Sequence, residues 1–421
     1  MVSNSFHEII QLMVLFNAFL GVVFIYVSIS VFYAFIFALA GRLGKTKSTP
    51  YSTSFKKFAV FIPSYKEDEV ILNTAKEALK QIYPAEYFDV IVIADSLKPA
   101  SIELLKTMPL KLVEVSFDQS TKAKSINEAF RVLPEIYDYV LILDADNIMA
   151  PDFIDKLNSR LVYTGVKAIQ GHRVAKNLNT KFAILDAISE EINNHVYRKG
   201  HRVLGLSSGL IGSGMAFDYR YYKSLMKTNN AIGGFDKESE LKILRDGLEI
   251  EYVEDAYVYD EKVENSEVFK NQRRRWISAQ LHYFRKYFLS GFYHLASRGN
   301  YDFFDKAFQQ FLLPRMLLLG FVSLMAFISV CLKGVFAFDL FPGVYFWVAI
   351  ALVKCSSVFL SIPNKYYNKQ TLNAALELPK VLILMFLTLF KLKGANKKFI
   401  HTPHSGNVII NTEEEIESGV K

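Results

Sequence analysis

A long apolar segment near the N-terminus sets the strongest limit on how this chain can fold. Residues 9–40 are apolar apart from small polar side chains such as Asn17 and Ser28. A helix needs about 20 apolar residues to cross a bilayer, and this segment is longer. No Lys or Arg precedes it, and it exceeds the core of a signal peptide. We therefore expect a retained membrane-spanning helix.

The charges beside this segment predict how the protein is oriented. Arg42, Lys45 and Lys47 follow it directly. Because Lys and Arg are enriched on the cytoplasmic side of membrane helices, we expect the next domain in the cytoplasm, at a bacterial-type inner or plasma membrane. Cys331 and Cys355 both lie in apolar runs, so no disulfide framework is expected, in agreement with a reducing compartment.

The formal net charge of +7 does not by itself indicate nucleic acid as a partner. Many Lys and Arg residues lie beside apolar segments, where anionic lipid headgroups attract them. No nucleic-acid-binding motif is recognisable. We therefore expect membrane lipids, and no nucleic acid, as partners.

Three more apolar stretches occur near the C-terminus, at residues 311–332, 344–362 and 376–390. The first two are long enough to span a bilayer. Glu377, Pro379 and Lys380 interrupt the third, so we expect it to lie at the interface and the chain to have three spanning helices. The alternative is a full crossing. The lysines beyond residue 390 favour a cytoplasmic C-terminus. We expect His401 and His404, near the C-terminus, to be exposed to solvent.

One further segment is expected to contact the membrane. Residues 279–293 combine aromatic and basic side chains, which predicts an amphipathic helix at the membrane surface.

Between these apolar regions the pattern changes to that of an α/β domain with a mostly parallel sheet. Short β-rich runs alternate with helical periodicity, and no glycine-rich dinucleotide motif follows the first run. Ligands of such sheets bind at the carboxyl ends of the strands. The expected strands are residues 58–62, 90–94, 112–115, 140–143 and 168–170, and the expected helices include 71–81 and 122–133.

Two short motifs carry the chemistry. Asp144 and Asp146 follow an apolar run, and alternation along a strand would place both carboxylates on one side. Hard oxygen ligands of this kind suit Mg²⁺ or Mn²⁺. Residues 272–276, with the sequence QRRRW, cluster guanidinium groups that could hold a departing diphosphate.

The order of the motifs resembles that of membrane-bound, inverting family-2 glycosyltransferases, which are related to cellulose, chitin and hyaluronan synthases. The motifs are residues 61–67 (FIPSYKE), Asp95 after the second strand, Asp144 to Asp146, and residues 272–276 before the apolar tail. The resemblance implies a GT-A fold, a UDP-sugar donor, and Mg²⁺ or Mn²⁺. It also implies three regions, a first spanning helix at 1–44, a cytoplasmic catalytic domain at 45–290, and a C-terminal membrane region at 291–421.

The resemblance also implies roles for individual residues. Asp144 and Asp146 are expected to bind the metal. The residues expected to bind the acceptor are Gly212, Gly214, Gln272 and Trp276. Arg273 and Arg274 are expected to contact solvent or lipid phosphates. Nucleotide-sugar binding falls to Pro63, Tyr65, Glu67, Asp95, Lys122, Asp144 and Arg275.

At the position of the catalytic base, this chain departs from the family pattern. The family normally reads Thr-Glu-Asp-x-x-Leu, and alignment on Leu241 places Glu238 where the catalytic Asp would be. A base must take the proton of the acceptor hydroxyl, and either carboxylic acid can do so. We expect Glu238 to be the base, with Asp236 as the alternative and Glu240 as a weaker one.

The sequence thus predicts a membrane-integrated inverting hexosyltransferase that forms a β-glycosidic bond on a lipid-linked or polysaccharide acceptor. Two alternatives remain in the same framework, a processive polysaccharide synthase and a catalytically inactive UDP-sugar-binding membrane protein. A nucleotidyltransferase would share the fold and metal but leaves residues 272–276 unexplained.

Overall fold

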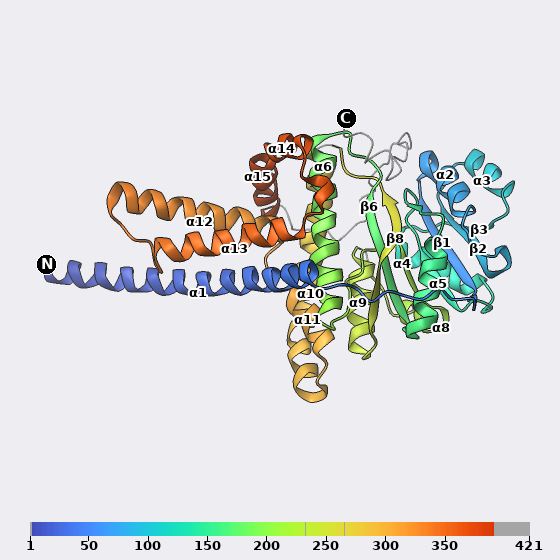
Figure 1. Ribbon diagram of the computed structural model, residues 1–421, viewed down its shortest axis with the longest axis horizontal. Helices are drawn as coiled ribbons and strands as arrows, with labels where there is room; N and C mark the ends of the chain where they lie inside the picture. The colour runs from blue at the N-terminus through green and yellow to red at the C-terminus, as the bar shows by residue number, and fades with distance from the viewer. Residues whose placement is uncertain (1, 232, 265, 391–421) are drawn as a thin grey trace.

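The computed structural model describes residues 2–231, 233–264 and 266–390. The basic residues beyond 390 and the histidines at 401 and 404 lie outside this range. Figure 1 shows an α/β domain from which long helices extend to one side. Residue 44, the expected first boundary, comes just after the first helix, whereas residue 290 falls inside a long helix, α10 (Ser266–Arg298).

The α/β domain contains an eight-stranded mixed sheet in the order β3-β2-β1-β4-β7-β6-β8-β5. Strands β1 to β4 are parallel to each other, and β6 is parallel to β8. The intervening β7 is antiparallel to both neighbours, as is β5 to β8. The strands are β1 (Phe58–Tyr65), β2 (Phe88–Asp95), β3 (Lys111–Val115), β4 (Tyr139–Ile142), β5 (Ile148–Met149), β6 (Ala168–Ala175), β7 (Met215–Asp218) and β8 (Ile250–Asp260).

All five strands expected from the sequence are confirmed, and three further strands complete the sheet. β5 and β7 are too short to show a recognisable alternation, and β8 mixes Glu251, Glu254 and Asp255 with its apolar residues. These additional strands make the sheet mixed. Local pattern could not indicate this, because strand direction depends on long-range pairing.

Both faces of the sheet are covered by helices, which explains its nearly continuous apolar strands. Along β1, Ala59 and Phe61 enter one core cluster, and Phe58, Val60 and Ile62 enter the other. The helices of this domain are α2 (Asp68–Ala78), α3 (Pro99–Lys106), α4 (Lys122–Val132), α5 (Phe153–Thr164), α6 (Lys181–Asn193), α7 (His201–Val203), α8 (Tyr219–Met226) and α9 (Phe235–Arg245), with η1 (Ala85–Tyr87) and the π-helical η2 (Asn194–Gly200).

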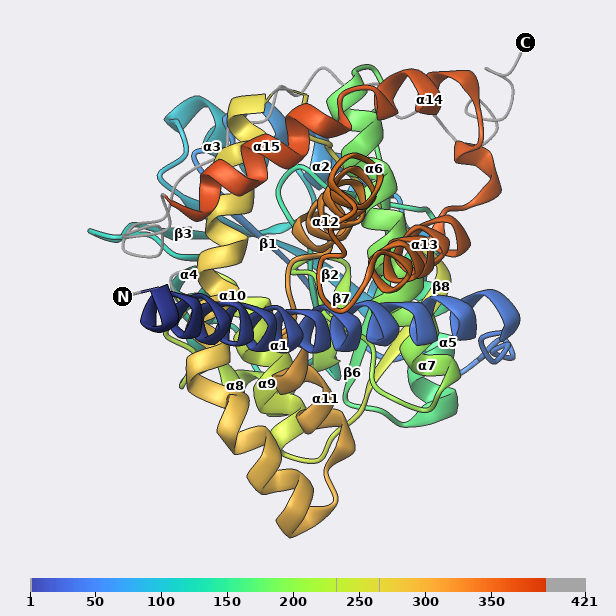
Figure 2. The ribbon, with the colours of Figure 1, turned by 90° about the vertical axis from the view of Figure 1, so that its left-hand side faces the viewer.

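Among the residues that the structure describes, three helices are long and apolar enough to cross a membrane, α1 (Val2–Leu43, of which Ile10–Leu43 is the apolar span), α12 (Arg315–Phe336) and α13 (Val344–Ser361). This agrees with the number expected. Helices α14 (Lys369–Ala375) and α15 (Leu378–Leu389), which follow η3 (Asn364–Tyr366), would add a fourth only as a single span bent by 43°. Figure 2 shows α15 running crosswise to α12 and α13, which are seen nearly end-on.

Helix α10 contains two segments that were described separately from the sequence, residues 272–276 and the amphipathic segment 279–293. It forms a hairpin with α11 (Tyr301–Gln309). Tyr283 and Tyr287 are buried in the core, whereas Leu289 and Tyr293 are exposed. One face of the expected amphipathic helix therefore packs on the α/β domain, and only part of it is available to a membrane surface.

Candidate active site

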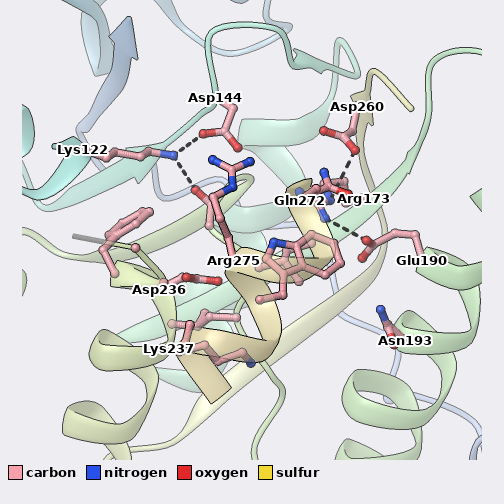
Figure 3. Close-up of a pocket in the computed structure, with 18 of the residues that line it drawn as sticks. Lys122, Asp144, Arg173, Glu190, Asn193, Asp236, Lys237, Asp260, Gln272 and Arg275 are labelled. Carbon is pink, nitrogen blue, oxygen red and sulfur yellow. Dashed lines mark hydrogen bonds and ion pairs between the residues drawn. The ribbon is translucent and has the colours of Figure 1, made fainter. Parts of the chain in front are cut away.

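A cavity of about 700 Å³ opens at the carboxyl ends of β1, β2 and β4, between the sheet and helices α9 and α10 (Figure 3). It gathers most of the site residues expected from the sequence. Three do not line it, Gly214, Glu238 and Glu240. Those that do are Pro63, Tyr65, Glu67, Asp95, Lys122, Asp144, Asp146, Gly212, Asp236, Gln272, Arg275 and Trp276.

The end of the cavity beside β1 and β2 fits a nucleoside. Asp95 ends β2 and is 1% exposed. Its Oδ1 accepts a hydrogen bond from the Ser96 hydroxyl (3.0 Å), whereas its buried Oδ2 has no hydrogen-bond partner within the described ranges. A buried carboxylate oxygen without a donor is costly, so a donor from a bound base or ribose would stabilise it.

Backbone strain occurs at the same place. Lys66 and Ser96 have φ values of 56° and 58°, which side chains other than glycine rarely adopt. The Lys66 N–H donates to the Asp95 carbonyl (3.1 Å), which ties the two strand ends together. Such strain persists only where the surroundings enforce it, and it is concentrated at functional sites.

We expect Asp95→Asn to raise the KM for the sugar nucleotide about tenfold or more, with a smaller effect on kcat. The carboxylate oxygen that would accept from the nucleoside is lost, and one such bond contributes about 1–3 kcal/mol when buried. Asp89→Asn, at the opposite end of the same strand, is the matched control. Equal KM values for the two variants would contradict a nucleoside site at Asp95.

Lys122 lies between the nucleoside end and the paired carboxylates. It is the first residue of α4, which Thr121 caps by accepting from the Lys124 N–H (3.2 Å). Its ammonium forms an ion pair with Asp144 and donates to the Gly212 carbonyl (2.8 Å), and both contacts are drawn in Figure 3. Gly212 has a φ of +85°, which a glycine adopts without strain.

Asp146 is the buried member of the acidic pair and is 5% exposed. With its amide oriented as these neighbours favour, Asn147 donates to both Asp146 oxygens (3.1 and 3.2 Å) and to Asp260 (3.0 Å). This orientation is assigned from the hydrogen-bond partners. Asn147 therefore fixes the Asp146 carboxylate at the cavity wall.

The donor set at this point allows a test of the expected metal. Within the described ranges, no group of three or more His, Cys, Asp or Glu side chains is arranged to hold an ion. Asp144 and Asp146 supply two carboxylates, and Mg²⁺ or Mn²⁺ often takes only one or two from the protein and the rest from phosphates and water. The residues thus fit a divalent cation that binds together with a diphosphate.

Helix α10 covers the cavity from the other side. Gln272 presents a buried Oε1 without a hydrogen-bond partner among the described residues, and Arg275 extends toward Asp144 (Figure 3). Burial lowers the pKa of the Arg275 guanidinium below its ordinary value. Trp276 is 42% exposed, and the Arg273 guanidinium stacks over its ring at 4.2 Å.

Arg273 does not meet solvent or lipid, contrary to the expectation from the sequence. It is buried, forms an ion pair with Asp186 on α6, and also contacts the Phe269 ring at 4.7 Å. This placement explains how QRRRW is positioned, because Arg273 anchors α10 to α6 while Arg275, two residues later, faces the cavity.

The structure separates the three acidic candidates for the base. Glu238 is absent from the cavity wall and is 4% exposed. Its Oε1 accepts from Lys286 (2.7 Å) and from the Tyr287 hydroxyl (3.0 Å), and Lys242 lies 3.2 Å away. Burial would raise the pKa of Glu238, but these three donors lower it below 4.5. This placement argues against the expectation that Glu238 is the base.

Asp236 lines the cavity near Gly212, two residues before Glu238 on α9. Burial raises the pKa of Asp236 above its ordinary value of 3.8, and the adjacent Lys237 opposes this shift. Figure 3 shows Asp236 on the opposite side of the cavity from Asp144. A raised pKa and access to the cavity suit a group that must accept a proton.

Glu240 and Gly214 have structural roles. The Glu240 carboxylate is fully buried, accepts from the Leu210 backbone N–H (2.5 Å) and pairs with Lys237 (3.1 Å). Gly214 has a φ of +62°, and a Cβ there would lie 2.7 Å from Val258. Gly214 thus allows close packing against Val258 just before β7, and it does not line the cavity.

Sequence reasoning missed a charged network on the wall formed by β6, α6 and η2. Arg173 donates to Glu190 (2.8 Å), and Arg198 lies 3.3 Å from the other Glu190 oxygen. Lys262 pairs with Asp260 (2.7 Å), next to Arg173 at 3.8 Å. A signal available in the sequence was the charge of Asp186, Glu190 and Glu191 among the apolar residues of this helix, because buried charges require partners.

Comparison with known proteins adds two findings. A family model described as glycosyltransferase like family 2 matches residues 56–279. No curated protein matches the sequence. Among solved structures, the fold is similar to that of the mannosyltransferase PcManGT from Pyrobaculum calidifontis in complex with GDP-Man and Mn²⁺, with a TM-score of 0.54, 14% identity, and coverage of 87% of this chain and 97% of that one.

Proposed function

The chain belongs to glycosyltransferase-like family 2, and we propose that it is a membrane-integrated inverting glycosyltransferase with a lipid-linked acceptor. Its fold is of the GT-A type expected from the sequence, and its donor is a sugar nucleotide. One observation carries the proposal. Asp236 lines the same cavity as Asp144 and Asp146, on the side opposite Asp144 (Figure 3).

We propose that Asp236 removes the proton of the acceptor hydroxyl as that oxygen attacks the anomeric carbon. The bond between this carbon and the diphosphate oxygen breaks on the opposite face, so an α-linked donor yields a β-glycoside. Arg275 and Lys122 would stabilise the negative charge of the leaving diphosphate. A divalent cation held by Asp144 and Asp146 would supply further charge neutralisation.

The donor we propose is a UDP-sugar. Asp95, with its buried Oδ2 free to accept, would bind the base or ribose together with the segment Pro63 to Glu67. The structural neighbour binds GDP-Man, so GDP-mannose is the second candidate. Both nucleotides carry a ring N–H and ribose hydroxyls that could donate to Asp95.

The membrane part supports a single transfer instead of processive synthesis. A channel for a growing polymer requires a continuous path through a helical bundle. This chain has three helices of spanning character, or four with the bent pair, within its described residues. We propose that α1, α12 and α13 anchor the enzyme with its catalytic domain in the cytoplasm, as the basic residues after α1 predict.

Donor turnover tests the proposal directly. Purified protein in detergent is supplied with Mn²⁺ and a panel of UDP-sugars together with GDP-mannose, and nucleotide release is followed with and without a membrane-lipid extract. We expect release with one donor and stimulation by the extract, with a β-linked product by NMR. Donor binding without any release would favour the inactive scaffold, and pyrophosphate release would favour a nucleotidyltransferase.

The pH dependence of transfer should report on Asp236. The base works only when deprotonated, so kcat should fall as the pH drops through its pKa, which burial raises above 3.8. We therefore expect kcat to fall at a higher pH than it would if the base were an exposed aspartate. The pH midpoint of this fall should be unchanged in Glu238→Gln. A shift of the midpoint in Glu238→Gln would instead assign the titration to Glu238.

A further inference from the structure

The ammonium group of Lys122 lies against one of the two carboxylates that fit a divalent cation. It forms an ion pair with Asp144 Oδ1 and donates to the Gly212 carbonyl (2.8 Å), as Figure 3 shows. The side chains of Lys122 and Asp144 are 19% and 32% exposed, so this pair is partly shielded from solvent. Water and salt therefore weaken it less than they weaken an ion pair on the surface.

Two other neighbours of the Lys122 ammonium are neutral. One is the Gly212 carbonyl, and the other is the ring of Phe235, whose centre lies 4.8 Å from Nζ, where a ring face attracts a cation. In the parts of the chain that the structure describes, Asp144 is the one carboxylate within ion-pair distance of Lys122. Asp144 therefore supplies the counter-charge of Lys122 at the cavity wall.

This ion pair opposes the binding of a free cation to the acidic pair. A divalent cation that approached Asp144 would compete with Lys122 for the carboxylate and would be repelled by its positive charge. Arg275 extends toward the same carboxylate and adds to this repulsion (Figure 3). Asp146 alone would offer a single carboxylate, whereas Mg²⁺ sites of this kind combine one or two carboxylates with substrate phosphates. The acidic pair is therefore poorly suited to hold a cation without a phosphate ligand.

A diphosphate changes the balance of charge at Lys122. The segment Ser120 to Ala123, at the start of α4, lines the cavity, and the N-terminal end of a helix favours phosphate. An ammonium group forms strong, charge-assisted hydrogen bonds with phosphate oxygens. The side chain of lysine has a flexible four-carbon stem, so its ammonium can change partner while α4 stays in place. A donor bound here would therefore attract Lys122 away from Asp144.

We propose that Lys122 exchanges partners when the donor binds. Without a donor, Lys122 neutralises Asp144 and keeps a free divalent cation from the acidic pair. With a donor, it bonds to the diphosphate and leaves Asp144 available to the metal. The inference rests on the proposed sugar-nucleotide chemistry and adds an order to it, in which the nucleotide enters before the metal or together with it. Donor and metal then favour each other's binding, because the donor removes the positive charge that opposes the metal.

Binding of Mn²⁺ to the full chain in detergent, without nucleotide, tests the exchange independently of turnover. The EPR signal of free Mn²⁺ gives the affinity. We expect Lys122→Met to raise this affinity about tenfold, because Asp144 loses the positive charge beside it. Adding Asp144→Asn to Lys122→Met should cancel the gain. The matched control is Lys124→Met, since Lys124 lies on the same helix, is exposed and donates to the Gln119 carbonyl (2.7 Å); this variant should bind Mn²⁺ as the wild type does.

Binding of UDP and GDP in the presence of EDTA measures the other half of the exchange. We expect Lys122→Met to weaken binding of the nucleotide that the wild type prefers about tenfold, since the diphosphate loses a charge-assisted hydrogen bond. If Lys122→Met fails to fold, Lys122→Gln replaces it, because its amide can still donate to the Gly212 carbonyl.

Two results would overturn the exchange. One is a Mn²⁺ affinity in Lys122→Met no higher than in Lys124→Met, because Lys122 would then serve the donor alone. The other is an unchanged nucleotide affinity in Lys122→Met. Either result can occur while donor turnover still supports the glycosyltransferase. A wild type that binds neither UDP nor GDP, with or without Mn²⁺, would instead contradict the proposed function itself.

Discussion

Replacing Asp236 with Asn is expected to lower kcat by about 10³-fold and to leave donor binding nearly unchanged. A general base typically contributes about 10²–10⁴-fold, and an amide cannot accept the acceptor proton. Burial disfavours the charged form of Asp236, so the neutral Asn should not destabilise the fold. Single-turnover transfer and donor binding, measured on the same preparation, separate the chemical step from binding.

Glu238→Gln is the matched control, because Glu238 lies on the same helix and was the base expected from the sequence. Its carboxylate is held by Lys286, Lys242 and Tyr287 outside the cavity. We expect this variant to retain transfer within a few-fold while losing stability, since two lysines lose their partner. Loss of transfer in Glu238→Gln with normal folding, and activity in Asp236→Asn, would restore the original assignment.

Asp146→Asn is expected to remove the metal dependence of donor binding and to lower transfer by about a hundredfold or more. A cation that neutralises a leaving diphosphate contributes several kcal/mol, and an amide is a poor ligand for it. The measurement is donor affinity with Mn²⁺ and with EDTA. Wild-type affinity should fall in EDTA, whereas the variant should bind weakly in both.

Asp255→Asn provides the control for Asp146, because Asp255 is an exposed carboxylate on β8 away from the cavity. It should behave as wild type in both conditions. If Asp146→Asn keeps a Mn²⁺-dependent affinity equal to that of the control, the cation is bound elsewhere and the assignment to this acidic pair is wrong.

Much of the site could be predicted because it lies at strand ends. Asp95 and Asp144 each follow an apolar run, and parallel neighbouring strands bring their carboxyl ends to one edge. The apolar segments could also be predicted from the sequence, because a bilayer sets a minimum length for a spanning helix. Sequence pattern alone therefore indicated both the cavity edge and the three helices of spanning character.

The choice between Glu238 and Asp236 could not be made in this way. The two residues are two positions apart on α9, so they point in different directions, and their roles depend on what faces each. Lys286 and Tyr287 come from α10, a helix that begins many residues later. Likewise, Arg273 pairs with Asp186 across elements whose relative placement no local pattern specifies.

By itself, the sequence determined the classes of element in this protein, the apolar helices and the order of the motifs, because these follow from local periodicity and composition. Only the tertiary structure decided which carboxylate faces the cavity and how α10 carries QRRRW against α6. The reason is physical. The environment of an ionisable group, and hence its charge, pKa and partners, is set by side chains distant in sequence.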